Sequence, residues 1–308
     1  MEPTLRKRAL LSKPSRTSKR AKDDRPLLAV DGDSFAHRSY HALPKTIRKG
    51  DGGAAGAIVG FGNYLLRLWR AERPRAVVVA WDTLEEATYR HEALEAYQSG
   101  REFDDELVEQ LDALPQFVEA FGFAIAKKAG YEADDFLAAA ATQEERKRGR
   151  ALVVTGDRDA FQLASERTTI LYPVKGGELL RIGPAEVRAR YGVEPAQVPD
   201  FIALRGDPSD KIPGARGVGA IGAATLLKKY GSLEAALKQG LFKSEAKELR
   251  LYRAIATMDR KAPLPKLGSQ KPTFGKAAAI ARGWNLVNLA ERIEQLAKDE
   301  DSAQRTQR

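Results

Sequence analysis

The sequence predicts an α/β protein built on a doubly wound, mainly parallel sheet. Three short apolar runs, at residues 27–30, 76–81 and 151–155, carry this prediction. They are rich in Val, Leu or Ala and lack polar alternation, which is typical of strands buried on both faces of a parallel sheet. Helix-like stretches separate the runs, and such alternation favours helices on both sides of one sheet.

Two of these stretches have clear helical signatures. Residues 54–72 form an apolar-rich segment with a basic end. Residues 133–148 start with acids and end in Arg and Lys, as the helix dipole prefers. The charged and aromatic segment 84–115 is a long connection, and connections of that length in α/β domains are usually functional or carry helices of their own.

The second half of the chain changes character. Glycines cluster over residues 206–240, around a helix-like stretch, and indicate a turn-rich helical module. Residues 241–300 are mostly helical by pattern, with a break at Pro263 and Pro265 before helix resumes near Ala290. We therefore expect an α/β domain over residues 26–200, a helical region over 201–300 and tails at 1–25 and 301–308.

Composition narrows the class of protein. The 308 residues suit one large domain or two coupled ones. The absence of cysteine excludes disulfides, thiolate zinc sites and a cysteine nucleophile, and it favours a cytoplasmic location. No apolar run approaches the ~20 residues that span a bilayer. Residues 1–25 contribute +6 of the formal net charge of +9, which predicts a solvated tail or, alternatively, a non-specific tether to phosphate backbones.

Each of the three strand-like runs ends at an aspartate. Asp31 follows the first run, Asp82 the second and Asp157 the third. Ligands of open α/β sheets bind outside the carboxyl ends of the strands, so we expect these side chains along one edge. Ordinary turn chemistry explains one aspartate after a strand, but three in one chain indicate a site.

More acids are expected at the same edge. They are Glu132, Asp134, Asp135, Asp159, Asp207 and Asp210. Helix capping explains one or two of the acids near the predicted helix start at residue 133, but not three. For Asp207 and Asp210, which flank residues 208–209, turn chemistry alone is the simpler explanation.

Nine carboxylates in one place would repel each other unless cations were bound. Carboxylate oxygens suit Mg²⁺ or Mn²⁺ rather than zinc, since the chain has no cysteine and only three histidines. Two such ions can hold a phosphodiester in line, activate a water and stabilise the leaving oxygen. The glycines near Gly217 do not follow a strand, which argues against a nucleotide cofactor. The residues thus predict a metal-dependent phosphodiesterase.

Seven motifs occur in a characteristic order: LLAVDGDSFAHRSYHALP, GAIVGFGNYL, VVVAWD, YRHEALEAYQSGR, GYEADDFLA, VVTGDRDAFQL and LRGDPSDKIPGARGVG. Together they resemble the 5′→3′ exonuclease and flap endonuclease family, which includes the N-terminal nuclease domain of bacterial DNA polymerase I. The resemblance spans roughly residues 26–300. It implies a PIN-like sheet, a helical arch at about 84–115 and a C-terminal helix-hairpin-type region that binds duplex DNA.

The resemblance also implies roles for the acids. The main catalytic ion would be held by Asp31, Asp82, Glu132 and Asp134, and the second ion by Asp135, Asp157, Asp159, Asp207 and Asp210. The implied reaction is hydrolysis of DNA at 5′ ends and branch junctions. The implied partner is DNA with a 5′ single strand or flap, with no membrane and no assigned protein partner. We expect a monomer associated with the nucleoid.

Basic, aromatic and glycine residues match the family's DNA contacts. These are Arg38, Arg90, Tyr97, Arg101, Gly217 and Gly219, and Arg90 would also act in catalysis. The glycine-rich segment 212–222 resembles an element that grips duplex phosphates around a potassium ion. For Tyr97, stacking on a base and simple packing in the arch remain alternatives. Trp69 and Trp81 are expected in the core, and the histidines are not expected to be ligands.

Three departures concern the basic half of the site. Gln98 stands where the family usually has a lysine that helps to stabilise the scissile phosphate. Lys211 adds a charge beside Asp210, and Ile221 replaces a lysine of the duplex clamp. These changes motivate an alternative, a structure-specific DNA-binding protein with weak or no catalysis. An RNA-cleaving enzyme of the PIN-like group is a further alternative.

Overall fold

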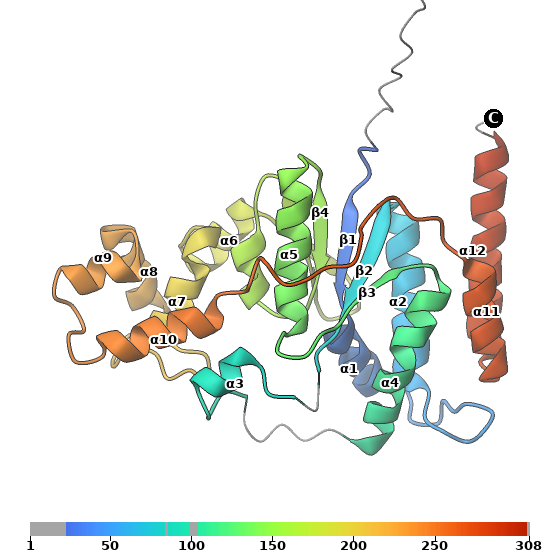
Figure 1. Ribbon diagram of the computed structural model, residues 1–308, viewed down its shortest axis with the longest axis horizontal. Coiled ribbons are helices and arrows are strands. Elements are labelled where there is room, and N and C mark those ends of the chain that lie inside the picture. Colours follow the sequence, from blue (N-terminus) through green and yellow to red (C-terminus); the bar gives the residue numbers. More distant parts are fainter. Residues whose placement is uncertain (1–22, 84–85, 99–103, 307–308) are drawn as a thin grey trace, which may run out of the picture.

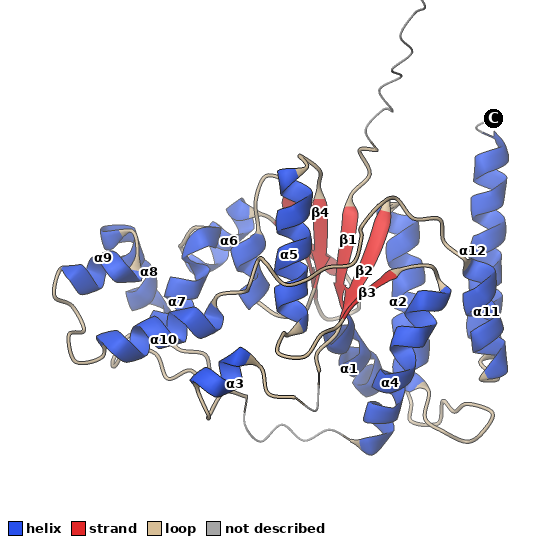
Figure 2. Ribbon diagram, viewed as in Figure 1, coloured by secondary structure: helices blue, strands red, loops and turns tan. Residues whose placement is uncertain are grey.

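The computed structural model describes residues 23–83, 86–98 and 104–306. Six strands form one sheet in the order β3-β2-β1-β4-β5-β6, shown in Figures 1 and 2. Their bounds are β1 Leu27–Asp31, β2 Ala76–Ala80, β3 Ala124–Ala126, β4 Ala151–Val154, β5 Thr168–Pro173 and β6 Leu179–Ile182. The first five strands are parallel and β6 is antiparallel to β5. The predicted mainly parallel sheet is therefore confirmed.

The central strand β1 pairs with β2 on one side and with β4 on the other. Leu27 lies opposite Ala76 of β2 and Ala151 of β4, so the three strands start level. Because they are parallel and in register, their carboxyl ends also reach the same edge. This edge is where α1 (Gly32–Ala42) begins, at the lower side of the sheet in Figure 1.

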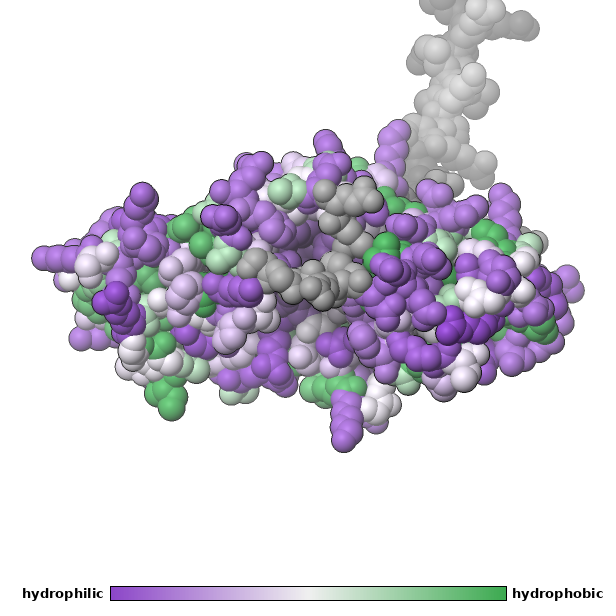
Figure 3. All heavy atoms as spheres, turned by 90° about the horizontal axis from the view of Figure 1, so that it is seen from below, coloured by the Kyte–Doolittle hydropathy of each residue, from purple (hydrophilic) through white to green (hydrophobic). Residues whose placement is uncertain are grey.

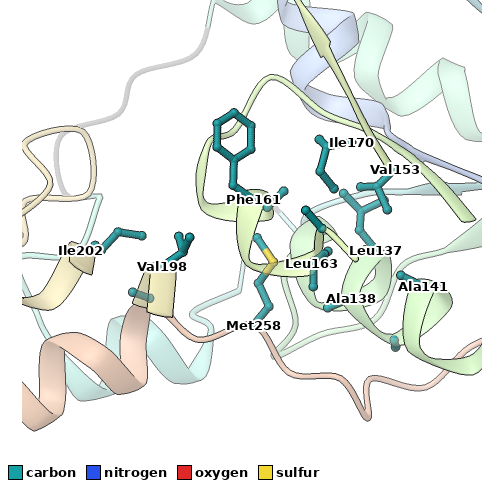
Figure 4. Packing of buried hydrophobic residues seen from close by; sticks show 14 of the residues in the cluster. Leu137, Ala138, Ala141, Val153, Phe161, Leu163, Ile170, Val198, Ile202 and Met258 are labelled. Atoms are coloured by element: carbon teal, nitrogen blue, oxygen red, sulfur yellow. The ribbon is translucent and has the colours of Figure 1, made fainter. Parts of the chain in front are cut away.

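Alternate residues of the strands face two separate apolar layers. On one face, Leu27 and Ala29 pack with α5 (Ala133–Arg146). Figure 4 shows this layer, where Leu137, Ala138 and Ala141 of α5 lie near Val153 and Ile170 of the sheet. Burial of both faces explains why the strands read as continuous apolar runs rather than alternating ones.

The opposite face is covered by a second group of helices. They are α1, α2 (Gly56–Glu72), α4 (Asp105–Ala120), α11 (Phe274–Gly283) and α12 (Val287–Thr306), and Figure 2 shows α2 and α4 beside the strands. Trp69 and Trp81 are 5% and 1% exposed in this layer, so their prediction as core residues is confirmed. Trp69 meets Phe274 of α11 edge to face, with 5.9 Å between the ring centroids, so this layer joins the C-terminal helices to the sheet.

A helical region extends the first layer beyond the sheet. It contains α6 (Pro184–Tyr191), α7 (Val198–Arg205), α8 (Ala220–Tyr230), α9 (Leu233–Lys238) and α10 (Ala246–Ala256), with the short 3₁₀ helices η1 (Asp159–Leu163) and η2 (Pro195–Gln197) at the junction. Val198 and Ile202 of α7 share one apolar cluster with Phe161 of η1 and with α5 (Figure 4). The helical region and the sheet therefore form one continuous core.

Several expected boundaries differ from the structure. Helix resumes at Phe274 rather than near Ala290. The expected boundary at residue 200 lies inside α7. The tail expected at residues 301–308 is helical as far as Thr306, and the ion pair Arg70–Asp299 at 3.1 Å holds this helix, α12, to α2. The basic tail expected at 1–25 lies outside the described residues except for 23–25.

In the described part of residues 84–115, where an arch is expected, α3 (Tyr89–Ala93) is followed by α4, which begins at Asp105. Leu107, Leu111 and Leu114 recur at helical spacing and are buried in the second layer, so this part belongs to the body of the protein. Across the residues that the structure describes, no helix has the length and apolar character needed to cross a bilayer.

Candidate active site

The three strand-end aspartates lie along one edge, as predicted. Asp31 is the last residue of β1, and Asp82 and Asp157 follow β2 and β4, the two strands that pair with β1. Asp31 caps α1, since its Oδ1 accepts a hydrogen bond from Ser34 N at 2.9 Å. Its Oδ2 accepts another from Thr155 Oγ1 at 2.7 Å. Both bonds fix the carboxylate at the edge.

Asp82 is fixed between two neighbouring elements. Its Oδ1 accepts a hydrogen bond from Ala133 N at the start of α5, at 2.6 Å. Its own N–H donates to Asp33 Oδ2 at 2.7 Å. Asp33 is a further acid of this edge that was not among the predicted site residues. The D-x-D spacing from Asp31, together with its place in the first turn of α1, was the sequence signal for it.

The start of α5 supplies three acids with different surroundings. Glu132 is the N-cap residue, and its Oε1 and Oε2 accept hydrogen bonds from Thr88 Oγ1 at 2.8 Å and Tyr97 Oη at 3.1 Å. Asp134 differs, because its Oδ1 is buried without a hydrogen-bond partner among the described residues. An unpaired buried carboxylate oxygen is costly unless a ligand satisfies it.

Asp135 is fully satisfied by protein groups. It is 0% exposed and both of its oxygens accept hydrogen bonds from Arg90, at 2.8 and 2.9 Å. Further donors are the backbone N–H groups of Glu132 and Asp259 and the hydroxyl of Tyr89. The structure therefore places Asp135 as a positioning group rather than as an open ligand.

The remaining acids form a second group. Asp159, at the start of η1, donates its backbone N–H to Asp157 Oδ1 at 2.8 Å. Asp207 accepts a hydrogen bond from Arg205 Nη2 at 2.9 Å, and Asp210 accepts one from Gln98 Nε2 at 3.1 Å. The negative charges of Asp157, Asp210 and Asp207 all act on Asp159, so these acids lie near one another.

The carboxyl groups of this edge disfavour one another's ionisation, and burial adds to the effect. Burial, supplemented by the charges of Asp82 and Asp157, raises the pKa of Asp31 to about 7. Burial and the charges of Asp157 and Asp31 likewise raise the pKa of Asp134 well above its usual value. Burial also raises the pKa values of Asp33 and Asp159, with neighbouring carboxylates contributing to both. Mutual repulsion of this kind favours the binding of cations.

The donor set fits hard divalent cations, which prefer carboxylate oxygens. The orphaned Oδ1 of Asp134 and the raised pKa values support that fit. In the described part of the chain, however, no three acidic or histidine side chains converge closely enough to form a finished metal site. Hydrogen bonds from Thr88, Thr155 and Gln98 hold several of the carboxylates in place, so closing a site requires side-chain adjustment.

A hydrogen-bonded chain connects the two acid groups. Gln98 Nε2 donates to Asp210 and also to Tyr97 Oη, at 2.9 Å, and Tyr97 in turn donates to Glu132. Gln98 holds a left-handed backbone with φ of 49°. Non-glycine residues adopt this conformation rarely, and functional sites are where the resulting strain tends to be kept. This bridge was not predicted from the sequence.

The residues predicted to contact DNA differ in how exposed they are. Tyr97 is 4% exposed, so in this structure it is packed and cannot stack on a base. Arg90 is 2% exposed and bonded to Asp135 and Ile255 O, which leaves it no surface for DNA. Burial thus favours the packing alternative for Tyr97 and argues against a direct DNA contact by Arg90. Arg38 is exposed, whereas Arg101 lies outside the described residues.

The glycine-rich turn before α8 is open. Gly217 has φ of 72°, and a Cβ added at Gly217 or Gly219 would meet no other atom. Ile221, in the first turn of α8, is 86% exposed. Figure 3 shows that the lower face of the molecule is mainly hydrophilic, with isolated apolar spots. The predicted clamp segment is thus accessible.

Comparison with known proteins supports one family. Residues 26–192 match a family model described as the 5′-3′ exonuclease N-terminal resolvase-like domain, and residues 193–273 match the 5′-3′ exonuclease C-terminal SAM fold. DNA polymerase I of Mycobacterium leprae is 44% identical over 211 residues, and that of Deinococcus radiodurans is 42% identical over 209. These stretches cover 68% of this chain but only 23% and 21% of the polymerases.

Solved structures share the fold at lower identity. The T5 5′-exonuclease with bound zinc has a TM-score of 0.63 and 18% identity, covering 89% of this chain and 99% of that one. The catalytic core of Rad2 in complex with a DNA substrate has a TM-score of 0.57 and 16% identity, covering 89% and 92%. Together with the carboxylate edge and the two matched domains, these similarities show that the chain belongs to the 5′-3′ exonuclease family.

Proposed function

We propose that this chain is a divalent-metal-dependent nuclease that hydrolyses DNA phosphodiesters at 5′ ends and at branch junctions. The observation that carries the proposal is the row of carboxylates at the ends of β1, β2 and β4, with Asp134 Oδ1 left unsatisfied beside it. A structural role gives no reason to keep so many like charges together. The membership of the chain in its family agrees with this activity.

The chain's own residues would divide the work between two sites. Asp31, Asp82, Glu132 and Asp134 would hold one Mg²⁺ or Mn²⁺, and Asp157, Asp159, Asp207 and Asp210 the other. When bound, two such ions supply Lewis-acid stabilisation of the charge that develops on the phosphate. Thr155 and Ser34 orient Asp31, and Ala133 N orients Asp82. Arg90 acts through Asp135, by fixing the first turn of α5 from which Glu132 and Asp134 project.

Duplex DNA would rest on the helical region. Backbone N–H groups of the open turn at Gly217 and Gly219 are suited to phosphate oxygens, since no side chain covers them. A potassium ion would bind at this turn, as the resemblance to the family implies. Arg38, exposed near the acid edge, would contact the strand to be cut.

The test is cleavage of matched substrates with and without Mg²⁺. A 5′-flap, a nick and a blunt duplex, each labelled, should yield metal-dependent products whose sizes report exonuclease or endonuclease action. Asp134→Asn and Asp157→Asn should abolish cleavage and leave the folded state intact. Asp112→Asn, an exposed acid on α4, serves as the matched control and should cut like the wild type. Wild-type rates for the two site variants would refute the assignment of the acids.

A binding protein with little catalysis is the second candidate. It is favoured by Gln98, whose neutral amide occupies the position next to Asp210, and by the absence of a finished metal site among the described residues. It predicts binding of flaps without turnover in either Mg²⁺ or Mn²⁺. Matched DNA and RNA flaps in the same assay separate a DNA nuclease from an RNA-cleaving one.

A further inference from the structure

A cavity of about 940 Å³ lies beside the acid edge, between α1, α2 and the turn that joins β5 to β6. Arg38 and His41 come from α1, Asn63, Tyr64 and Arg67 from α2, and Gly176 and Gly177 from the turn. Cavities of roughly 300–1,000 Å³ are the size that small ligands occupy. None of the nine predicted acids lines it.

The charge of the cavity is opposite to that of the neighbouring site. Arg38 and Arg67 line it, and no Asp or Glu does. Both arginines are exposed, and within the described residues neither forms an ion pair with an acid. Two unpaired guanidinium groups at one cavity are suited to a phosphate, which arginine binds with paired N–H donors.

An aromatic wall adds a second feature. The Tyr64 ring lies 4.2 Å from the Phe35 ring, centroid to centroid, and the Arg67 guanidinium lies over it at 4.6 Å. The Tyr64 hydroxyl is buried, and the polar group beside it is the Arg67 guanidinium, which can donate a hydrogen bond but not accept one. An orphaned donor next to two cations needs an acceptor, and a phosphate oxygen would supply one.

The cavity is directly connected to the catalytic edge. Ser34 lines the cavity and its Oγ accepts a hydrogen bond from Gly156 N at 3.2 Å. The Arg38 guanidinium packs against Gly156, so that a Cβ added there would overlap it. Gly156 directly precedes Asp157. A DNA strand bound at the carboxylates can therefore place a neighbouring nucleotide in the cavity.

We propose that this cavity binds one phosphate-bearing nucleotide of a single strand, next to the phosphodiester held at the carboxylates. Arg38 and Arg67 take the phosphate, and Tyr64 Oη donates to it. The inference rests on the proposed function, since it assigns part of the same substrate. The anion site in the cavity is then distinct from the metal site at the carboxylates, and Gly156 lies between the two.

The experiment measures binding of the full-length chain to short oligothymidylates with a 3′ fluorophore, in EDTA so that no cleavage occurs. Anisotropy is recorded over a NaCl series, for probes with a 5′-phosphate and with a 5′-hydroxyl. Arg67→Ala should bind roughly tenfold more weakly, as expected for one lost charge-assisted contact. The slope of log affinity against log salt should fall by about 0.7, the share of one phosphate on a single strand.

Three variants sharpen the result. Arg67→Lys should keep the salt slope, and Tyr64→Phe should weaken binding several-fold while leaving the slope unchanged. Arg70→Ala is the matched control, because Arg70 is exposed on the same helix outside this cavity. Its affinity should equal that of the wild type.

The outcomes separate cleanly. A loss confined to the 5′-phosphate probe identifies a terminal phosphate, and an equal loss with both probes identifies a backbone phosphate; either supports the site. Equal affinities of Arg67→Ala and Arg70→Ala overturn it. A loss in Arg67→Ala with none in Tyr64→Phe places the strand on the outside of α2 and also overturns it. A wild-type chain that binds in this way but never cuts with Mg²⁺ refutes the proposed function alone.

Discussion

Arg90 and Asp135 form a buried two-pronged ion pair, with Nη1 2.9 Å from Oδ2 and Nη2 2.8 Å from Oδ1. The pair joins α3 to the first turn of α5, and Arg90 Nε also donates to Ile255 O at the end of α10, at 2.9 Å. Three parts of the chain that are distant in sequence therefore meet at one guanidinium. Its role is to hold the acidic turn in place.

Removal of one partner should be strongly destabilising. Arg90→Ala leaves Asp135 buried without its cation, which costs about 3–5 kcal/mol for pairs of this kind. Urea denaturation measures the loss. The matched control is Arg250→Ala, which breaks an equally well-formed but exposed pair with Glu234 and should leave the urea midpoint close to that of the wild type, because solvent screens exposed pairs. Equal midpoints for the two variants would contradict the assignment.

Tyr97→Phe distinguishes a positioning role from stacking on a base. Phenylalanine keeps the aromatic ring but loses the hydrogen bonds to Glu132 and Gln98. We expect kcat for flap cleavage to fall several-fold with KM nearly unchanged, because Glu132 loses a fixed donor while the DNA contacts remain. Unchanged kcat would show that the hydroxyl has no part in the reaction.

The metal-free protein should lose stability as pH rises from about 4 to about 7. Burial raises the folded-state pKa of Asp31 to about 7, while the unfolded value is near 3.9. The folded state therefore keeps the proton longer, so the cost of ionising Asp31 is absent below pH 4 and grows until the pH passes the folded pKa.

Thermal unfolding in EDTA across this pH range tests that expectation. Asp31→Asn cannot ionise, so its melting temperature should rise relative to the wild type as the pH increases. Added Mg²⁺ should remove the difference by stabilising the charged wild-type site. A constant difference between the two proteins at every pH would show that Asp31 does not titrate in this range.

Gln98→Lys should increase the rate of cleavage. Gln98 places a neutral donor 3.1 Å from Asp210, at the bridge between the two acid groups. A cation there can stabilise charge on a nearby phosphate, an effect worth on the order of tenfold or more in rate at a dry site. Gln98→Met, similar in length but without donor or charge, is the control, and single-turnover kinetics are the measurement. Equal rates for the lysine and methionine variants would rule out the electrostatic effect.

The sheet was predictable because its strands are buried on both sides. Runs such as Leu27–Val30 carry that burial in their composition, and a parallel sheet brings the ends of β1, β2 and β4 to one edge. The positions of Asp31, Asp82 and Asp157 therefore followed from one-dimensional pattern alone. The core roles of Trp69 and Trp81 followed from the same apolar runs.

The partners of the charged side chains could not be predicted in the same way. Arg90 and Asp135 are 45 residues apart in the sequence, and no local pattern shows that they meet in a buried pair. Tyr97 lies in a charged connecting segment, where a surface position is expected, yet its hydroxyl donates a hydrogen bond to Glu132. Such pairings depend on how the helices pack, which is a tertiary property.

The segment after α10 ties the helical region to the sheet domain. Gln162 of η1 donates to Ala256 O at 2.9 Å and accepts from Met258 N at 3.1 Å, and Asp259 N donates to Asp135. These hydrogen bonds hold the open glycine turn and the carboxylate edge at a fixed distance from each other. If duplex DNA rests on the glycine turn, that distance, rather than the base sequence, sets the position of the cut.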